Sequence, residues 1–281
     1  MREYSLGRRL MPHIFLWIAM IIIIFPIYIV FVASTHLNEE ILSAPMSLLP
    51  GVHIVENYTR ALLDGAANLG ASAFVMVKNS LIMALGISGG KIIISLLAAF
   101  AIVFFDFPGR NFCFWAIFIT LMLPVEVRIM PTYKVIADLG MLNSYAGLIL
   151  PMVVSATAVF LFRQFFLTIP REIVESSQID GASPMQFFSI ILAPMTQTPI
   201  VAMFVIQFIY GWNQYLWPLL ITTKQEFYTL LIGINRMMSG ADVQIEWQIV
   251  MATILVAMIP PVIVVIAMQR QFIQGMTERE K

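Results

Sequence analysis

Six long apolar stretches constrain this chain more than any other feature of its sequence. A helix needs about 20 mostly apolar residues to cross the hydrocarbon core of a bilayer. The stretches of about this length lie near residues 12–34, 81–105, 112–131, 143–162, 199–221 and 248–268. Because the backbone in lipid must satisfy its own hydrogen bonds, these stretches are expected to be helices. The sequence therefore predicts an all-α integral membrane protein with six transmembrane helices.

Composition and charge support this class. The chain has 281 residues, of which 60% are hydrophobic and only 11% are charged. Soluble domains contain about 25% charged residues, so the length suits one membrane domain rather than a soluble domain with an anchor. The formal net charge is zero, and no basic surface indicates nucleic-acid binding. Cys113, the single cysteine, lies in an apolar stretch and is expected to be a small buried residue.

The sequence divides the chain into three parts. Residues 1–76 are expected to hold the N-terminal tail, the first transmembrane helix and a periplasmic segment, residues 77–268 the main transmembrane domain, and residues 269–281 a cytoplasmic tail. The first apolar stretch is longer than the roughly 7–15 residues of a signal-peptide core, so we expect it to be retained. Lysine and arginine favour the flanks on the same side as the N-terminus. Both termini are therefore predicted to be cytoplasmic.

The motifs of common enzyme classes are absent from the sequence. There is no GxxxxGK[ST] phosphate loop, and the glycine-rich residues 86–91 lie inside an apolar stretch without a preceding strand. The three histidines, His13, His36 and His53, lack the spacing of metal ligands. We therefore expect no catalytic residue, no metal site and no cofactor bound by this chain.

Three charged residues lie inside the predicted spans. Lys91 falls about midway along the second span, where a cation costs roughly 2.5–3.5 kcal/mol on insertion scales. It either adds positive potential to a pathway for an anionic solute or pairs with a carboxylate or carbonyl at a subunit interface. Glu126 and Arg128 raise the same question near the outer end of the third span. Their spacing places them on different helix faces, and the Arg128 guanidinium suits a phosphate or a carboxylate.

Residues 210–219 are dense in aromatic side chains with hydrogen-bonding tips. They lie toward the outer half of the fifth span. Two interpretations are open: an interfacial aromatic belt, or a polar lining near the middle of the bilayer that includes Asn213 and Gln214. The candidate residues of a solute pathway are therefore Lys91, Glu126, Arg128, Trp212, Asn213 and Gln214.

Residues 163–199 form a polar break between two apolar stretches. Because proline is tolerated in the first turn of a helix, Pro170 favours a short helix over residues 170–179. Gly181 follows, and it can adopt the left-handed conformation that often ends a helix. With the N-terminus inside, this break faces the cytoplasm.

A second short helix is predicted directly after the glycine. Ser183 and Gln186 have the spacing of a capping box, in which each side chain satisfies a backbone N–H of the other residue. Pro184 takes the first helical position, and Pro194 breaks or ends the helix. The pattern predicts a helix, a glycine turn and a helix at the membrane surface.

A specific motif lies within this polar break. The EAA loop of binding-protein-dependent ABC importer permeases resembles the pattern Glu175, Ser176, Ser177, Gln178, Ile179, Asp180, Gly181 and Ala182, followed by Phe187, Ile190 and Pro194. Serines stand at 176 and 177 where the family pattern has alanines, but serine is still small enough for close approach. The resemblance covers about residues 77–268. It implies that nine of these residues couple the chain to an ATPase: Glu175, Ser176, Ser177, Asp180, Gly181, Ala182, Phe187, Ile190 and Pro194.

The resemblance also implies a fold, partners and a cargo. Residues 120–129, 160–166 and 208–219 resemble permeases of bacterial sn-glycerol-3-phosphate importers, which belong to the carbohydrate-type branch. The implied fold is the type I ABC importer permease fold in the bacterial inner membrane. The implied partners are a sister permease, two copies of an ATPase subunit that uses ATP and Mg²⁺, and a periplasmic solute-binding protein. The implied cargo is sn-glycerol-3-phosphate, with glycerophosphodiesters as further candidates.

Three other functions are considered beside an ABC importer permease for sn-glycerol-3-phosphate. A permease for a neutral sugar would share the fold, although Lys91 and Arg128 favour an anion. A secondary transporter would need its own coupling-ion site and usually an inverted repeat, and the sequence shows neither. A membrane enzyme would need a cluster of acid, base or metal-binding residues. In the related maltose importer only the sister of this type of subunit contacts the solute, so the sequence leaves open which permease does so here.

Overall fold

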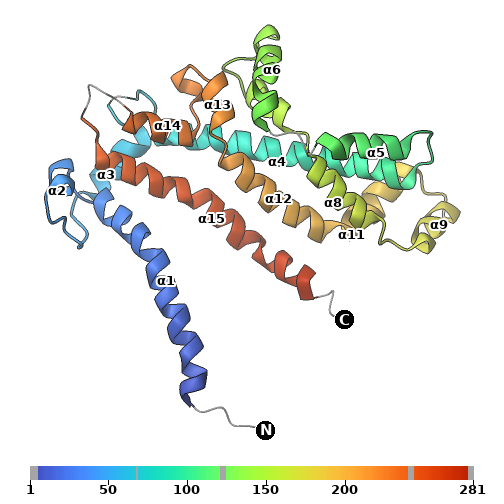
Figure 1. The fold of residues 1–281 in the computed structure, drawn as a ribbon, viewed down its shortest axis with the longest axis horizontal. Helices are drawn as coiled ribbons and strands as arrows, with labels where there is room; N and C mark the ends of the chain where they lie inside the picture. Colours follow the sequence, from blue (N-terminus) through green and yellow to red (C-terminus); the bar gives the residue numbers. More distant parts are fainter. Residues whose placement is uncertain (1–5, 68, 121–124, 240–243, 278–281) are drawn as a thin grey trace. The chain divides into compact units, whose positions relative to one another are not determined.

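The computed structural model describes residues 6–67, 69–120, 125–239 and 244–277. Within these ranges the chain is helical and contains no strand, as the sequence predicts. The longer helices are α1 (Leu6–Ser34), α3 (Ile54–Leu63), α4 (Ala73–Phe104), α5 (Arg110–Ile119), α6 (Val125–Asp138), α8 (Ala156–Phe166), α9 (Arg171–Ile179), α12 (Gln197–Trp212), α14 (Leu230–Met238) and α15 (Trp247–Thr277). The shorter ones are α2 (Asn38–Leu42), α7 (Tyr145–Ile149), η2 (Leu150–Met152), α10 (Pro184–Gln186), η3 (Phe187–Leu192), α11 (Ala193–Met195), α13 (Leu216–Ile221) and η4 (Gln225–Phe227). Figure 1 shows their order along the chain.

The chain forms two compact units. The first contains residues 1–75 and 233–258, and the second contains residues 76–232 and 259–281. α4, α14 and α15 each contribute residues to both units. The division into an N-terminal part, a main domain and a tail at residues 76 and 268 remains a prediction from the sequence.

Three helices are long and apolar enough to cross a membrane. They comprise Met11–Ser34, Ala73–Phe104 and Trp247–Gln269. Two further candidates are bent pairs, in which Tyr145–Met152 meets Ala156–Phe166 at 49° and Pro184–Met195 meets Gln197–Trp212 at 75°. The described residues therefore hold up to five candidate spans. The third predicted span falls on α5 and α6, which are separated by residues 121–124 outside the described ranges, so the number of six remains a prediction.

Neither the fourth nor the fifth predicted span is one continuous helix. The fourth breaks before Ala156, because the Ser155 hydroxyl accepts a hydrogen bond from the Ala158 N–H and starts α8 afresh. The fifth ends at Trp212 and restarts at Leu216. Pro218 explains this break, because it has no N–H to donate and its ring clashes with a continuing helix.

The second unit is built by close packing around α4. A Cβ added at Gly211 of α12 would lie 3.0 Å from the Ala84 Cα, so a larger residue would force the two helices a few tenths of an ångström apart. Asn79 on α4 holds the segment before α14 by hydrogen bonds. Its Nδ2 donates to the carbonyl oxygens of Glu226 at 2.8 Å and Tyr228 at 2.9 Å. The Tyr145 hydroxyl donates to the Asn79 Oδ1 at 2.7 Å. α4 is therefore the element on which the rest of this unit is assembled.

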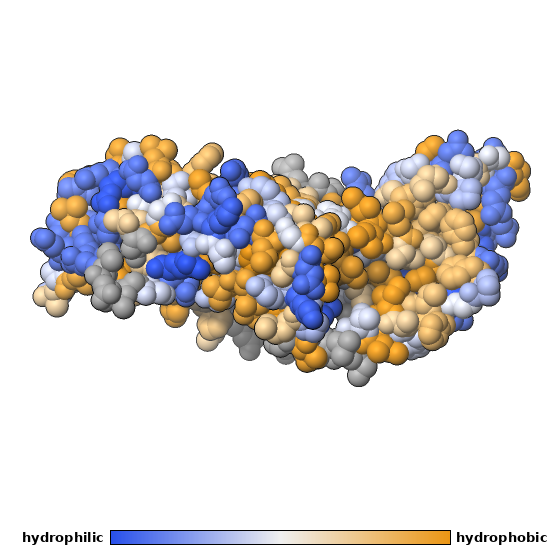
Figure 2. All heavy atoms as spheres, turned by 90° about the horizontal axis from the view of Figure 1, so that it is seen from above, coloured by the Kyte–Doolittle hydropathy of each residue, from blue (hydrophilic) through white to orange (hydrophobic). Residues whose placement is uncertain are grey.

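Apolar side chains cover much of the face shown in Figure 2. The exposed residues include long runs of isoleucine and phenylalanine on α1 and isoleucine on α15. A bilayer does not penalise such exposure, in contrast to water. Cys113 was expected to be buried, but it is exposed on α5. In lipid an apolar residue of this kind needs no burial inside the protein, which accounts for the difference.

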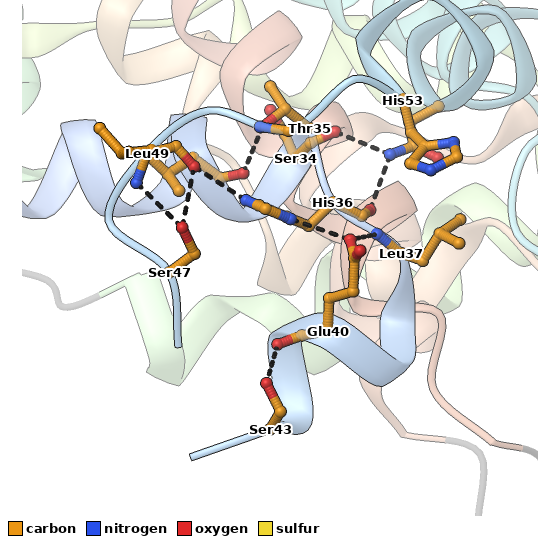
Figure 3. Close-up of polar contacts among 12 residues, drawn as sticks. Ser34, Thr35, His36, Leu37, Glu40, Ser43, Ser47, Leu49 and His53 are labelled. Carbon is orange, nitrogen blue, oxygen red and sulfur yellow. Dashed lines mark hydrogen bonds and ion pairs between the residues drawn. The ribbon is translucent and has the colours of Figure 1, made fainter. Parts of the chain in front are cut away.

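Polar contacts hold the first unit together after α1. The Asn57 side chain of α3 donates to the carbonyl oxygens of Ser34 at 3.0 Å and His36 at 2.9 Å. Arg60 forms a 2.6 Å ion pair with Glu246, just before α15. Figure 3 shows the loop after α1, in which the His36 ring lies between the Leu49 carbonyl oxygen and the Glu40 carboxylate.

The stability of this loop is expected to depend on pH through His36. Its Nε2 lies 2.9 Å from the Leu49 carbonyl oxygen and its Nδ1 lies 2.9 Å from Glu40 Oε2. Only a protonated imidazole donates from both nitrogens, so the Leu49 carbonyl, and then Glu40, raise the pKa of His36 above its ordinary value of 6.5. The Leu37 backbone N–H, and then His36, lower the pKa of Glu40 below its ordinary value of 4.5. The stabilisation of the loop by protonated His36 is complete below pH 6.5 and is lost as the pH rises through the raised pKa. The stabilisation by ionised Glu40 is complete above pH 4.5, so it does not change between about pH 5.5 and about pH 8.

We therefore expect residues 37–50 to be more protected from hydrogen exchange at about pH 5.5 than at about pH 8, after correction for intrinsic exchange rates. Mass spectrometry of the detergent-solubilised protein would measure this. His36→Gln should remove the difference, because glutamine does not titrate. Equal protection at both pH values in the wild-type chain would contradict the role of His36.

Candidate functional site

The polar break folds as the sequence predicts. α9 begins after Pro170 and ends at Ile179, with Asp180 as its C-cap. Gly181 has a φ of +77°, in the left-handed region that glycine adopts without strain. The Ala182 N–H donates to the Ser177 carbonyl oxygen at 3.0 Å and the Gly181 N–H to the Gln178 carbonyl oxygen at 3.0 Å, so the glycine turn satisfies the end of the helix.

The second short helix has the predicted cap. The Ser183 Oγ accepts a hydrogen bond from the Gln186 N–H at 3.4 Å, and the Ser183 N–H donates to the Gln186 Oε1 at 2.8 Å. Pro184 occupies the first turn. The chain continues through the π-helical η3 and through α11, which contains Pro194, to Thr196, where it turns by 75° into α12. We call residues 171–195 the α9–α11 segment; Figure 1 shows α9 beyond the end of α8 and α11 beside α8.

One face of this segment is anchored inside the second unit. Phe187 is only 5% exposed, and its ring lies 5.3 Å from that of Phe104 and 6.4 Å from that of Phe100 on α4. Ser177 is buried, and its hydroxyl donates to the Val174 carbonyl oxygen at 2.7 Å. A small side chain is therefore needed at 177. The Phe187 ring is used inside the chain and not on the surface expected for a partner.

The other face carries the groups that a partner would meet. Glu175, Ser176, Asp180 and Gly181 are exposed, and Ala182 is partly buried. Ile190 is 68% exposed, as expected for an apolar contact residue.

Sequence reasoning missed two apolar residues of this face. Ile179 is 86% exposed and Met185 is also exposed, on either side of the glycine turn. The sequence feature that could have identified them is a large apolar side chain within an otherwise polar segment. Exposed apolar side chains beside acidic ones are typical of a protein interface.

A polar cluster lies elsewhere in the second unit, between α4 and α12. The Lys91 side chain is only 6% exposed, and its Nζ donates to the Gln207 Oε1 at 2.9 Å. The same Nζ lies 3.7 Å from the centroid of the Tyr210 ring. Sequence reasoning identified Lys91 but missed Gln207 and Tyr210 as its partners. The sequence places both on α12, three residues apart, and residues at this spacing share a helix face.

The other predicted pathway residues are not all gathered at this cluster. Arg128 is exposed on α6, and its charge acts on Lys91 and Tyr210. Trp212 is buried and stacks on Phe208, with ring centroids 5.9 Å apart. Their roles in a solute pathway remain predictions.

The remaining three predicted residues of the solute pathway are Asn213, Gln214 and Glu126. Asn213 is exposed as the C-cap of α12. Gln214 is partly buried and donates to the Tyr210 carbonyl oxygen at 3.2 Å. Glu126 belongs to α6, but its side chain lies outside the described residues.

The long apolar helices indicate a membrane protein, and the capped polar segment presents an exposed face that a partner protein could contact. Residues 91–278 match the family of binding-protein-dependent transport system inner membrane components. The chain belongs to this family of ABC importer permeases.

Relatives similar to the chain over nearly its whole length carry one name. It is 55% identical to the sn-glycerol-3-phosphate transport system permease protein UgpE of Brucella melitensis, covering 97% of each chain. The proteins of the same name from Agrobacterium fabrum and Escherichia coli are 54% and 53% identical, covering 97% and 96% of each chain.

A solved structure supports the fold. A chain in the crystal structure of a bacterial ABC transporter involved in the import of the acidic polysaccharide alginate matches with a TM-score of 0.82 at 20% identity. The match covers 97% of this chain and 100% of that one. The predicted type I permease fold is thereby confirmed.

Proposed function

We propose that this chain is a permease subunit of an ATP-driven importer that carries sn-glycerol-3-phosphate across the bacterial inner membrane by alternating access. The observation that carries this proposal is the identity of 53–55% to permeases of that name, over almost the whole of each chain. Glycerophosphodiesters are further candidate cargoes, because they contain the same glycerol phosphate group.

The α9–α11 segment is the proposed contact with a separate ATPase. Its inner face is held by the buried Phe187 ring, so it can move as a rigid body with the helices that it joins. Its outer face presents Glu175, Asp180 and Ile190 to the partner. Coupling requires that these contacts differ between the two states of the importer, because a partner shifts an equilibrium only by its difference in affinity.

The proposed assembly contains a sister permease, two copies of the ATPase and a periplasmic solute-binding protein. ATP and Mg²⁺ are bound by the ATPase, and this chain binds no cofactor and catalyses no reaction. Both termini and the α9–α11 segment face the cytoplasm. The excess of lysine and arginine on that side supports this orientation.

The cargo is tested by transport in proteoliposomes that contain the complete complex. We expect uptake of sn-glycerol-3-phosphate only with ATP and the solute-binding protein, together with stimulation of ATP hydrolysis. Maltose and similar neutral sugars should stimulate neither activity. Stimulation by the sugars instead would favour the neutral-sugar permease, and ion-driven uptake without the ATPase would favour a secondary transporter.

A further inference from the structure

Lys91 is a buried cation with neutral partners. Its Nζ touches the amide oxygen of Gln207 and the face of the Tyr210 ring. A carbonyl dipole and an aromatic ring stabilise a cation, but neither cancels its charge. Among the described residues, no ion pair involves Lys91. The Arg60–Glu246 pair shows how this chain neutralises a charge where it needs only structure.

The surroundings of Lys91 suit an anion with hydroxyl groups. Gln207 and Tyr210 lie at i and i+3 on α12, so they share one face of a helix that is otherwise largely apolar. Gln214 follows just after this helix and donates to the Tyr210 carbonyl oxygen. Arg128 adds a second positive charge that acts on Lys91 and Tyr210. A buried cation beside amide and phenol groups, with a second cation acting on it, matches the chemistry of a polyol phosphate, whose phosphate accepts hydrogen bonds from cations and whose hydroxyls bind amides.

We propose that Lys91, held in place by Gln207 and Tyr210, recognises the dianionic phosphate of the cargo in this subunit. This inference rests on the proposed function. An apolar residue at this position would avoid the free-energy cost of burying a cation between membrane helices. The competing explanation is an ion pair with a carboxylate, supplied by Glu126 or by a partner subunit.

The test compares two cargoes of different charge. sn-Glycerol-3-phosphate carries nearly two negative charges at neutral pH, whereas the phosphate of a glycerophosphodiester carries one. Lys91→Gln removes the positive charge and keeps a hydrogen-bonding side chain. We expect about a tenfold or greater rise in the KM for uptake of sn-glycerol-3-phosphate and a smaller rise for the diester. Lys91→Arg should retain the preference of the wild-type complex.

Gln207→Glu tests the role of the Lys91 charge without altering Lys91 itself. Gln207→Glu has the same shape and gives the ammonium a carboxylate partner. It should reduce uptake of the dianionic cargo more than uptake of the diester. Lys78→Gln is the matched control, because Lys78 is an exposed lysine on the same helix, and it should leave the preference unchanged.

The outcomes separate this inference from the proposed function. An equal loss for both cargoes, or unaltered uptake by Lys91→Gln and Gln207→Glu, would overturn the phosphate contact alone. Restoration of the Lys91→Gln complex by Glu126→Gln would assign Lys91 to an ion pair and would also overturn it. Failure of the wild-type complex to transport either phosphate compound would instead overturn the proposed function.

Discussion

Glu175→Arg is expected to abolish ATP-driven uptake while the importer still assembles. Glu175 is exposed on α9, and no described side chain forms an ion pair with it. Reversing its charge therefore disturbs no ion pair of the described chain, and the effect arises at the proposed ATPase contact. We expect uptake to fall to background and stimulation of ATP hydrolysis by the solute-binding protein to be lost.

Gly181→Val tests the same contact through the backbone. Gly181 has a φ of +77°, and open space surrounds the position of an added Cβ, so the variant is strained only by its conformation. The left-handed conformation costs an ordinary residue about 1–2 kcal/mol. The turn between α9 and α10 should shift, and uptake should be lost.

Gly109→Val is the matched control for this variant. Gly109 has a φ of +85° and equally open surroundings, but it precedes α5, outside the α9–α11 segment. It should keep most of the uptake activity. Co-purification of the complex would confirm assembly of every variant. Normal uptake and normal stimulated ATP hydrolysis in Glu175→Arg and Gly181→Val would show that this segment does not couple the two proteins.

The second large effect is expected from Phe187→Ala. The ring is buried between Phe100 and Phe104 of α4 and belongs to a core that includes Phe162 and Phe166 of α8. Removing a buried phenylalanine side chain costs about 3–5 kcal/mol, through lost transfer energy and the cavity left behind. We expect the α9–α11 segment to detach locally, with faster hydrogen exchange and faster proteolysis at residues 171–195.

Ile190→Ala is the natural comparison, because Ile190 lies in the same segment and is 68% exposed. It should leave hydrogen exchange nearly unchanged in the isolated chain and weaken only the binding of the ATPase. If both variants showed the same protection, Phe187 would not anchor the segment.

The structure of the α9–α11 segment could be predicted because its determinants are local. Ser183 and Gln186 cap a helix over three residues, and Gly181 needs only its own backbone freedom. The partner face was predicted less completely. Which apolar residues point outward depends on how α4 and α8 pack against the segment, so the sequence did not show that Phe187 is buried and Ile179 is exposed.

Interactions between distant residues could not be predicted in the same way. Gln207 is 116 residues from Lys91 in the sequence, and the pair forms only when α4 and α12 pack closely at Gly211. Hydropathy likewise showed apolar length but not the position where α8 begins, because a serine cap within a membrane stretch is a weak signal beside its apolar neighbours. The polar cluster therefore required the tertiary structure.

The turn at Thr196 is a point about which α12 could tilt as a rigid helix. Thr196 is fully buried, its hydroxyl donates to the Leu192 carbonyl oxygen at 2.6 Å, and α12 leaves it as 16 helical residues. At about 1.5 Å per residue, Gln207 lies about 15 Å along this helix. A tilt of about 10° around Thr196 would therefore carry Gln207 about 2–3 Å, comparable with the 2.9 Å that separates its amide oxygen from the Lys91 ammonium. We therefore expect a small displacement of the α9–α11 segment to break the contact between Gln207 and the Lys91 ammonium.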